Sequence, residues 1–156
     1  MTLSIDPRTL LARPPSEVEW EDLLLRLDIM PRALRVAIED APADAAVAEA
    51  LEDAVESEVR IQEELDAMAR GVDAPASVVV DLRDPSPGGL LAQFTRLRTR
   101  TFAMVQRRGL NVWDWTSRGA GPFDGATAYQ LLQAAAQADG ELLAAIRGAG
   151  REGAAA

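Results

Sequence analysis

The feature that most constrains the fold of this 156-residue chain is a segment whose apolar side chains recur at alternating steps of four and three residues. That spacing places them on one face of an α-helix, as in the helices of packed bundles. The helix is expected from about Ala45 to Arg70, and Gly71 is placed to end it. Glu58 is a carboxylate at a position where the pattern predicts an apolar side chain. The face consists of Val47, Leu51, Ala54, Glu58, Ile61, Leu65 and Met68.

Three further segments have helical spacing of their apolar residues. The first begins after Ser16, which stands three residues before Glu19, as in a capping box. A third helix is expected from roughly Leu90 to Arg108. A fourth is expected from near Thr127 to Arg147, again with capping-box spacing at its start. Four helices of this kind predict an all-α four-helix bundle.

Pro31 lies inside the apolar run of the first helix. Proline has no backbone N–H, so it removes the hydrogen bond that residue 31 would otherwise donate to the carbonyl of Leu27. We therefore expect a kink or a break in the first helix at this point.

We expect the chain to form one domain over residues 1–156. An irregular lead-in is expected over residues 1–15 and a flexible tail over residues 148–156. The link between the first two helices is short, so we expect these helices to be antiparallel neighbours. A long connection joins helices 2 and 3, and its valines at 78–80 predict a short extended piece.

The composition removes most catalytic side chains. The chain contains no histidine, no cysteine and no lysine, so all of its 16 positive charges are arginines. An imidazole base, a thiolate nucleophile and a Schiff-base lysine are therefore excluded. Transition metals lose their preferred nitrogen and sulfur ligands, and a carboxylate site for magnesium or calcium has no loop signature here. We expect no cofactor and no metal.

The charge of the chain excludes other partners. The formal net charge is −9, which repels the phosphate backbone of nucleic acids and anionic membrane surfaces. No apolar run reaches the length that spans a bilayer. Residues 1–7 lack the basic and apolar regions of a signal peptide. We expect a cytoplasmic protein that binds neither nucleic acid nor membrane.

Three motifs in the second half of the chain occur in a characteristic order. They are a phenylalanine and an arginine four residues apart on the third helix, a tryptophan loop followed by arginine and glycines, and a degenerate form of the rhythm HDxxHLxxI. The residues concerned are Phe94, Arg98, Trp115, Arg118, Gly119, Gly125 and residues 138–146. In these motifs the chain resembles the DinB/YfiT-like proteins, a bacterial group of four-helix bundles. The resemblance implies a DinB-like bundle.

The resemblance also implies where a metal would be held. In that family, three histidines typically bind a divalent metal, one on the second helix and two on the last. The two positions on the last helix are here Ala138 and Leu142. The position on the second helix is Ala50 or Asp53, depending on how the HLxDxE pattern is aligned. At least two of the three ligands are absent, so the resemblance implies a degenerate metal site.

Glu58, Arg98 and Asp139 are expected to form a polar cluster inside the bundle. One interpretation makes these residues, together with Trp115, contacts of a small ligand at the place where relatives hold metal. The other, which we favour, makes Arg98 a structural arginine neutralised by a carboxylate, because a buried charge needs a partner.

Trp113 and Trp115 have three possible roles: stacking on a ligand, closing the end of the bundle, or burial at a dimer interface. We favour packing or the interface, and the alanine-rich helices and the analogy with relatives support a homodimer. The sequence thus predicts a non-catalytic binding or interaction protein without catalytic residues. The alternative is an enzyme of the same fold that uses carboxylates and Arg98, resembling the thiol-dependent transferases of the family.

Overall fold

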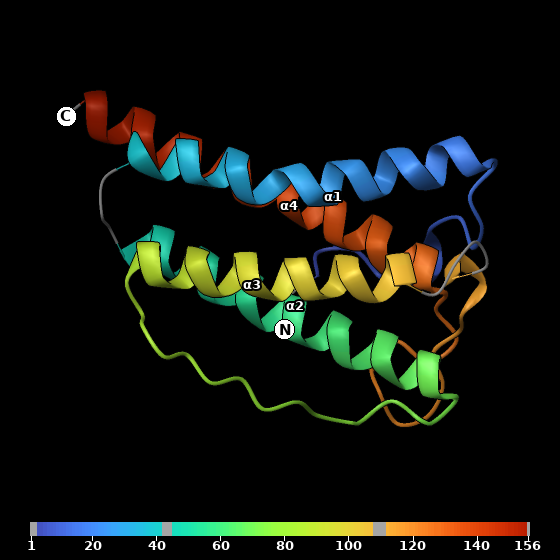
Figure 1. Ribbon diagram of the computed structural model, residues 1–156. Coiled ribbons are helices and arrows are strands. Elements are labelled where there is room, and N and C mark those ends of the chain that lie inside the picture. The colour runs from blue at the N-terminus through green and yellow to red at the C-terminus, as the bar shows by residue number, and fades with distance from the viewer. Residues whose placement is uncertain (1–2, 42–44, 108–111, 156) are drawn as a thin grey trace.

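The computed structural model describes residues 3–41, 45–107 and 112–155, and it confirms the predicted all-α four-helix bundle (Figure 1). Within these residues no strand is present, although two isolated β-bridges join Ala74 to Gly119 and Thr116 to Thr127. In chain order, the helices are the 3-10 helix η1 (Pro7–Thr9), α1 (Glu17–Glu39), α2 (Ala45–Arg70), α3 (Pro87–Arg107), the 3-10 helix η2 (Val112–Asp114) and α4 (Ala128–Ala155).

The arrangement of the helices differs from the expected one. Helix α1 packs against α3 and α4, and α2 packs against the same two helices, so α1 and α2 lie diagonally across the bundle. The prediction that they are neighbours is therefore wrong. The link over residues 40–44 can span about 16 Å at 3.3 Å per residue. Neighbouring helix axes lie about 8–10 Å apart, so a link of this length reaches the diagonal as well as the adjacent position.

The direction of the helices follows from this arrangement. Helices α1 and α4 run one way, and α2 and α3 run the other way (Figure 1). Because α2 and α3 are parallel neighbours, the connection over residues 71–86 has to return along the length of the bundle, as Figure 1 shows. The valines at 78–80 belong to this connection and form no strand.

The ends of the helices test the expected caps. At the start of α4, the Thr127 N–H donates to Gln130 Oε1 (2.9 Å) and the Gln130 N–H donates to Thr127 Oγ1 (3.2 Å), so this capping box is confirmed. At the start of α1, the Ser16 hydroxyl instead bonds the carboxylate of Glu19 and caps no backbone group. Gly71 ends α2 with φ = 66°, as the sequence predicted.

Helix α1 continues through Pro31, so of the expected kink or break the break does not occur. Two expected boundaries are wrong. Helix α3 begins at Pro87 rather than Leu90, since proline suits the first turn and Ser86 Oγ accepts the Gly89 N–H at 3.1 Å. Helix α4 continues beyond Arg147 to Ala155. A β-carbon on Gly150 would lie 3.3 Å from the carbonyl oxygen of Asp40, so this part of α4 lies close against the end of α1.

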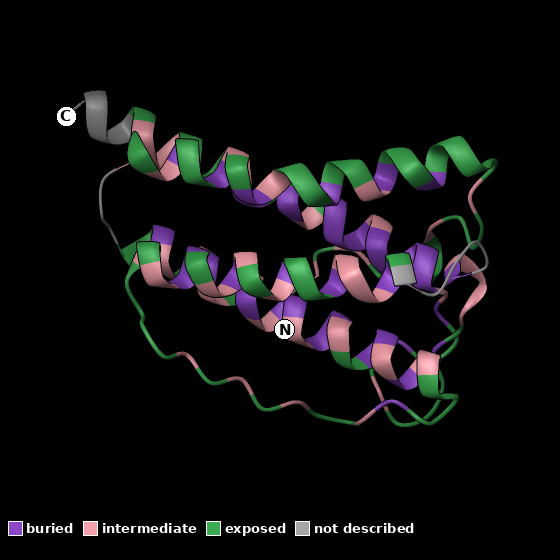
Figure 2. Cartoon of the chain, in the orientation of Figure 1, coloured by how far each residue is buried: buried purple, intermediate pink, exposed green. Residues whose placement is uncertain are grey.

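The core consists of two main apolar clusters, one toward each end of the bundle, and buried residues line the inner faces of the helices (Figure 2). We call them the Trp20 cluster and the Leu34 cluster. The buried members of the first are Trp20, Leu23, Leu27, Ile61, Leu65, Val105, Val112, Ala128, Tyr129, Leu132, Ala135 and Ala136. Those of the second are Leu34, Ala37, Val47, Leu51, Val55, Leu90, Leu91, Phe94, Leu142 and Ile146.

Candidate functional site

A layer of polar groups separates the two apolar clusters. On α2, Glu58 lies between a member of the Leu34 cluster and a member of the Trp20 cluster. Arg98 has the same place on α3, and Asp139 has it on α4. All three residues are buried, with 2–4% of their surface exposed. The structure thus brings together the three charged residues that the sequence placed in the interior.

Arg98 uses its whole guanidinium group in this layer. Its Nε and Nη2 donate to the two oxygens of Glu58 at 3.0 and 3.1 Å. Its Nη1 and Nη2 donate to the two oxygens of Asp139 at 2.8 and 2.9 Å. A fifth hydrogen bond runs from Nη1 to the carbonyl oxygen of Leu27 at 2.9 Å. An arginine side chain has five N–H groups, so every donor of Arg98 has an acceptor.

The bond to Leu27 connects α1 to the layer through Pro31. In a regular helix, the carbonyl of Leu27 would accept the N–H of residue 31, but proline has none. The freed carbonyl oxygen accepts Nη1 of Arg98 instead. The proline at which a kink or a break of α1 was expected therefore leaves an acceptor for a buried charge.

Further contacts hold the layer in place. The Thr101 hydroxyl donates to Oε1 of Glu58 at 2.8 Å, and Gln62 Nε2 donates to the Thr101 hydroxyl at 3.0 Å. The Phe94 ring lies under the guanidinium, with its centroid 4.8 Å from Cζ of Arg98. That distance allows a cation–π contact in a site largely removed from water.

The layer carries one positive and two negative charges. Burial alone would lower the pKa of Arg98, but the charges of Glu58 and Asp139 outweigh it and raise this pKa above its ordinary value. Burial raises the pKa of Asp139 above its ordinary value, and the hydrogen bonds from Arg98 oppose this rise. The cluster therefore has one negative charge that no buried cation balances.

A pocket of about 230 Å³ opens beside the polar layer, on the side formed by α2 and α4. Side chains of Glu58, Arg98 and Asp139 form part of its wall. Leu3 of the lead-in also lines it, and the neighbouring Ser4 hydroxyl donates to Oε1 of Glu141 at 2.8 Å. The remaining lining residues are Ala50, Asp53, Ala54, Ser57, Ile61, Phe94, Ala135, Ala138, Glu141, Leu142 and Ala145.

The positions at which the resemblance places metal ligands all face this pocket. Ala138 and Leu142 line it from α4, and both candidates on α2, Ala50 and Asp53, line it from the opposite side. Among the residues that the structure describes, no three Asp or Glu side chains are grouped so that they could hold a metal ion.

Trp115 does not share this site. It is half-buried and packs against the Trp20 cluster, as does Trp113. The ring of Trp113 meets that of Trp20 edge to face, with centroids 5.6 Å apart. The two loop tryptophans therefore contribute to packing at one end of the bundle, and neither lines the pocket at the polar layer.

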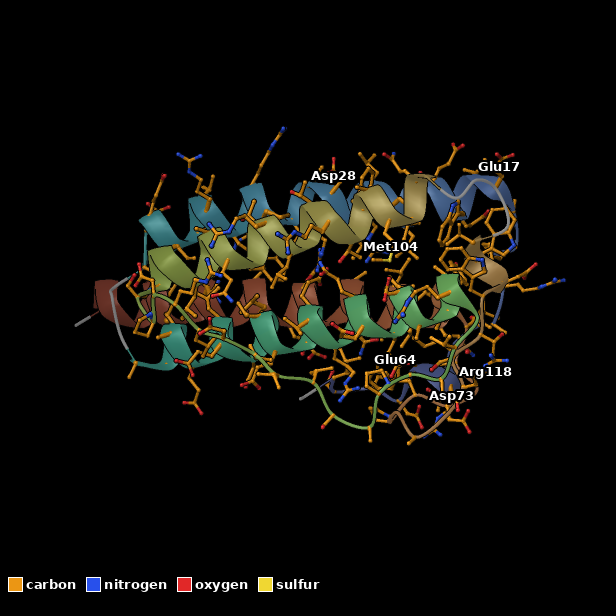
Figure 3. The ribbon with its side chains drawn as sticks, turned by 60° about the horizontal axis from the view of Figure 1, so that its bottom comes forward. Glu17, Asp28, Glu64, Asp73, Met104 and Arg118 are labelled. Atoms are coloured by element: carbon orange, nitrogen blue, oxygen red, sulfur yellow. The ribbon has the colours of Figure 1, made fainter. Side chains whose placement is uncertain are left out.

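A third buried carboxylate contacts the loop that precedes α4. Glu64 of α2 is fully buried, and Oε2 accepts the hydroxyl of Ser117, while Nη1 of Arg60 lies 3.9 Å from Oε1. A β-carbon on Gly121 would lie 2.6 Å from Oε1, so glycine is required for this approach. Figure 3 shows Glu64 at the end of α2 where the loops with Asp73 and Arg118 lie. These contacts hold the loop that precedes α4 against α2.

The sequence did not indicate every residue of the pocket. The sequence indicated Asp53 only as an alternative metal position, and it did not indicate Ser57 or Glu141 as site residues. Their signal was weak, because each lies on the polar side of its helix pattern, where solvent exposure is the ordinary expectation. Leu3 reaches the pocket from a segment without periodicity, so no pattern could have placed it.

Comparisons with known proteins add no relative: no family model, no curated protein and no solved structure matches this chain. Within the described residues, no helix combines the length and the apolar character needed to cross a membrane.

We predict that Arg98→Met lowers the free energy of unfolding by roughly 3–5 kcal/mol, because it leaves two carboxylates buried without their partner. Replacing the cluster as a whole, with Arg98→Met, Glu58→Leu and Asp139→Leu, should restore most of that loss. Urea denaturation at neutral pH measures the free energy of unfolding of both variants. Arg100→Met is the matched control, since Arg100 lies on the same helix but is exposed. It should change stability by less than about 0.5 kcal/mol, and an equally small loss for Arg98→Met would contradict the prediction.

We predict that Pro31→Ala depends on Arg98. The substitution returns an N–H that can bond the Leu27 carbonyl, which already has a partner when Arg98 is present. In the Arg98→Met background that carbonyl has lost its donor, so Pro31→Ala should be more favourable there by about 1 kcal/mol. Any cavity left by the proline ring is common to both backgrounds and cancels in the cycle. Equal effects of Pro31→Ala in the two backgrounds would show that the carbonyl does not couple them.

Proposed function

We propose that this chain is a non-catalytic binding protein of the DinB-like type, without the metal site of its relatives, and that its pocket holds a small organic cation. The observation that carries the proposal is the charge of the pocket wall. Four carboxylates line it against a single guanidinium. These residues are Asp53, Glu58, Asp139, Glu141 and Arg98.

The charge balance favours a cation. The positive charge of Arg98 is shared between Glu58 and Asp139, which leaves that cluster one negative charge in excess. Asp53 and Glu141 add two more formal negative charges. A concave site with an excess of one sign of charge attracts ligands of the opposite sign. Apart from Ser57, alanine, leucine, isoleucine and phenylalanine side chains form the remaining wall and suit a short alkyl chain.

The size of the pocket limits the ligand. Pockets for drug-sized molecules typically measure about 300–1,000 Å³, and this one measures about 230 Å³. A ligand of the size of a short alkylamine or alkylguanidine fits that volume. Its ammonium or guanidinium would lie toward Asp53 and Glu141, which do not pair with Arg98.

The hydrogen bonds of the polar layer favour binding over the alternative of a carboxylate-based enzyme. A general acid or base has to reach the proton that it transfers. The oxygens of Glu58 and Asp139 already accept the N–H groups of Arg98, and Glu58 also accepts the hydroxyl of Thr101. Neither carboxylate is thus available for proton transfer without losing its partner.

The remaining parts of the proposal are the family, the assembly and the location. The DinB-like assignment is supported by the convergence of Ala50, Asp53, Ala138 and Leu142 on one pocket. The homodimer and the cytoplasmic location stay predictions from the sequence. Because the loop tryptophans pack within the chain, the surface of a dimer has to be sought elsewhere.

We predict that butylamine and butylguanidine raise the melting temperature of the protein, whereas butanol and butyrate do not. The probes share an alkyl chain and differ in charge, so a selective shift isolates the contribution of the carboxylates. Asp53→Asn with Glu141→Gln should weaken binding of butylamine roughly fivefold, as for a partly exposed charge pair. Thermal shift and titration calorimetry provide the two readouts.

The matched control for these substitutions is Glu63→Gln, since Glu63 is an exposed acid of α2 that does not line the pocket. It should leave the affinity unchanged. Equal shifts with butanol and butylamine, or equal weakening by Glu63→Gln, would mean that the carboxylates of the pocket do not select the ligand.

We predict that the purified protein contains no stoichiometric transition metal. The chain offers no imidazole and no thiolate, and alanine and leucine occupy the ligand positions on α4. Elemental analysis after dialysis without chelator checks this. About one zinc or nickel ion per chain would refute the metal-free proposal.

A further inference from the structure

An apolar stripe runs along the outer face of α1. Of the seven large apolar side chains that are exposed in the described part of the chain, four lie on this helix: Val18, Leu25, Ile29 and Val36, with 49–62% of their surface exposed. Their spacing of seven, four and seven residues keeps them on one side of the helix. Figure 2 shows this outer face of α1 as mainly exposed, and Figure 3 shows Glu17 and Asp28 on the solvent side of the same helix.

Two charged residues complete the stripe. Asp22 and Arg32 occupy the gaps, so that the whole series advances by alternating steps of four and three residues, and both are exposed. This is the spacing of a helix that packs lengthwise against another helix. The complete series is Val18, Asp22, Leu25, Ile29, Arg32 and Val36.

The stripe is symmetric about residue 27. Val18 and Val36 lie at equal distances from that point, as do Leu25 and Ile29. Asp22 and Arg32 are also equidistant from it and have opposite charges. Two copies of the helix packed antiparallel about a twofold axis at this point therefore place valine against valine and leucine against isoleucine. They also place each aspartate against an arginine.

The charges that flank the stripe are mixed in both halves of α1. The first half carries Glu17, Glu19, Glu21 and Arg26, and the second half carries Asp28, Arg35 and Glu39. In the antiparallel pair, Glu21 and Arg35 of the second copy lie on the same side of the seam and two residues, or about 3 Å, apart in height, within reach of an ion pair.

We propose that α1 is the interface of a homodimer in which two copies of this helix pack antiparallel about residue 27. The inference rests on the homodimer of the proposed function and names its surface. A second copy is the occupant because the stripe is complementary to itself in the order of its apolar and charged residues, as a twofold interface requires. No residue of α1 lines the pocket at the polar layer, so the pocket stays open in this dimer.

Single cysteines test the direction of pairing, because the chain has none of its own. Val18→Cys and Val36→Cys are prepared separately, one with a tag that changes its mass, and are oxidised with oxidised glutathione alone and as a mixture. In the antiparallel pair, thiols at identical positions lie about 27 Å apart, at 1.5 Å per residue over 18 residues. The mixture should therefore form at least about fivefold more cross-linked dimer than either variant alone. Val79→Cys, at a 94% exposed position outside the helices, measures the background from random collision.

Charge exchange tests the register. Asp22→Arg or Arg32→Asp alone places like charges opposite each other twice per dimer and should raise the dimer dissociation constant at least about tenfold. The double variant exchanges the two charges and should restore the constant to within about threefold. Sedimentation equilibrium measures the constants, and circular dichroism confirms that each variant is folded.

The outcomes of these experiments distinguish a failure of the α1 interface from a failure of the homodimer or of the proposed pocket. Cross-linking of Val18→Cys with itself would indicate a parallel pair and overturn the inference. A dimer in sedimentation without cross-linking above the Val79→Cys background would keep the homodimer and overturn the α1 surface. A monomer at micromolar concentration would overturn both. Binding of butylamine should be the same in the charge-exchanged variants, since the pocket does not include α1.

Discussion

The four helices meet at one buried guanidinium. An arginine without partners in this position would cost several kcal/mol, so the fold holds only where acceptors from α1, α2 and α4 converge on it. Each helix contributes at the same level: Leu27 with its carbonyl, and Glu58 and Asp139 with their carboxylates. Sliding any helix by one turn would separate a charge from its partner. The polar layer thus sets the register of two apolar clusters that by themselves would tolerate several registers.

The sequence predicted the helices better than their arrangement. Periodic apolar spacing was sufficient to place α2 from Ala45 to Arg70, and the misfit of Glu58 in that pattern indicated an interior charge. The pairing of helices was not predictable in this way, because a short link reaches a diagonal as well as an adjacent position. The sequence predicted only part of the contact between Arg98 and α1. Pro31 indicates that the carbonyl of Leu27 lacks its helical donor, but only the fold shows that Arg98 donates to it.

The pocket lies where the resemblance places a metal, and it is also the site of the ligand that we propose. The residues at the positions of metal ligands are small or apolar on α4, and carboxylates of Asp53 and Glu141 lie nearby. Where a metal would need three converging donors, this wall has dispersed negative charge and a volume of about 230 Å³. The ligand that we propose for this place is therefore a diffuse organic cation rather than an ion with strict coordination geometry. The full set of pocket residues was not predictable from the sequence, because the wall combines residues from the polar sides of several helices.

The diagonal arrangement of α1 and α2 affects how the chain folds. Among the four long helices of the described residues, α1 packs mainly on α3 and α4 rather than on α2, its neighbour in the sequence. The parallel pair α1 and α4 joins segments separated by about a hundred residues or more, so long loops have to close before the core can form. Rates of folding fall as the mean sequence separation of contacts rises. We therefore expect this bundle to fold more slowly than an up-and-down bundle of the same length.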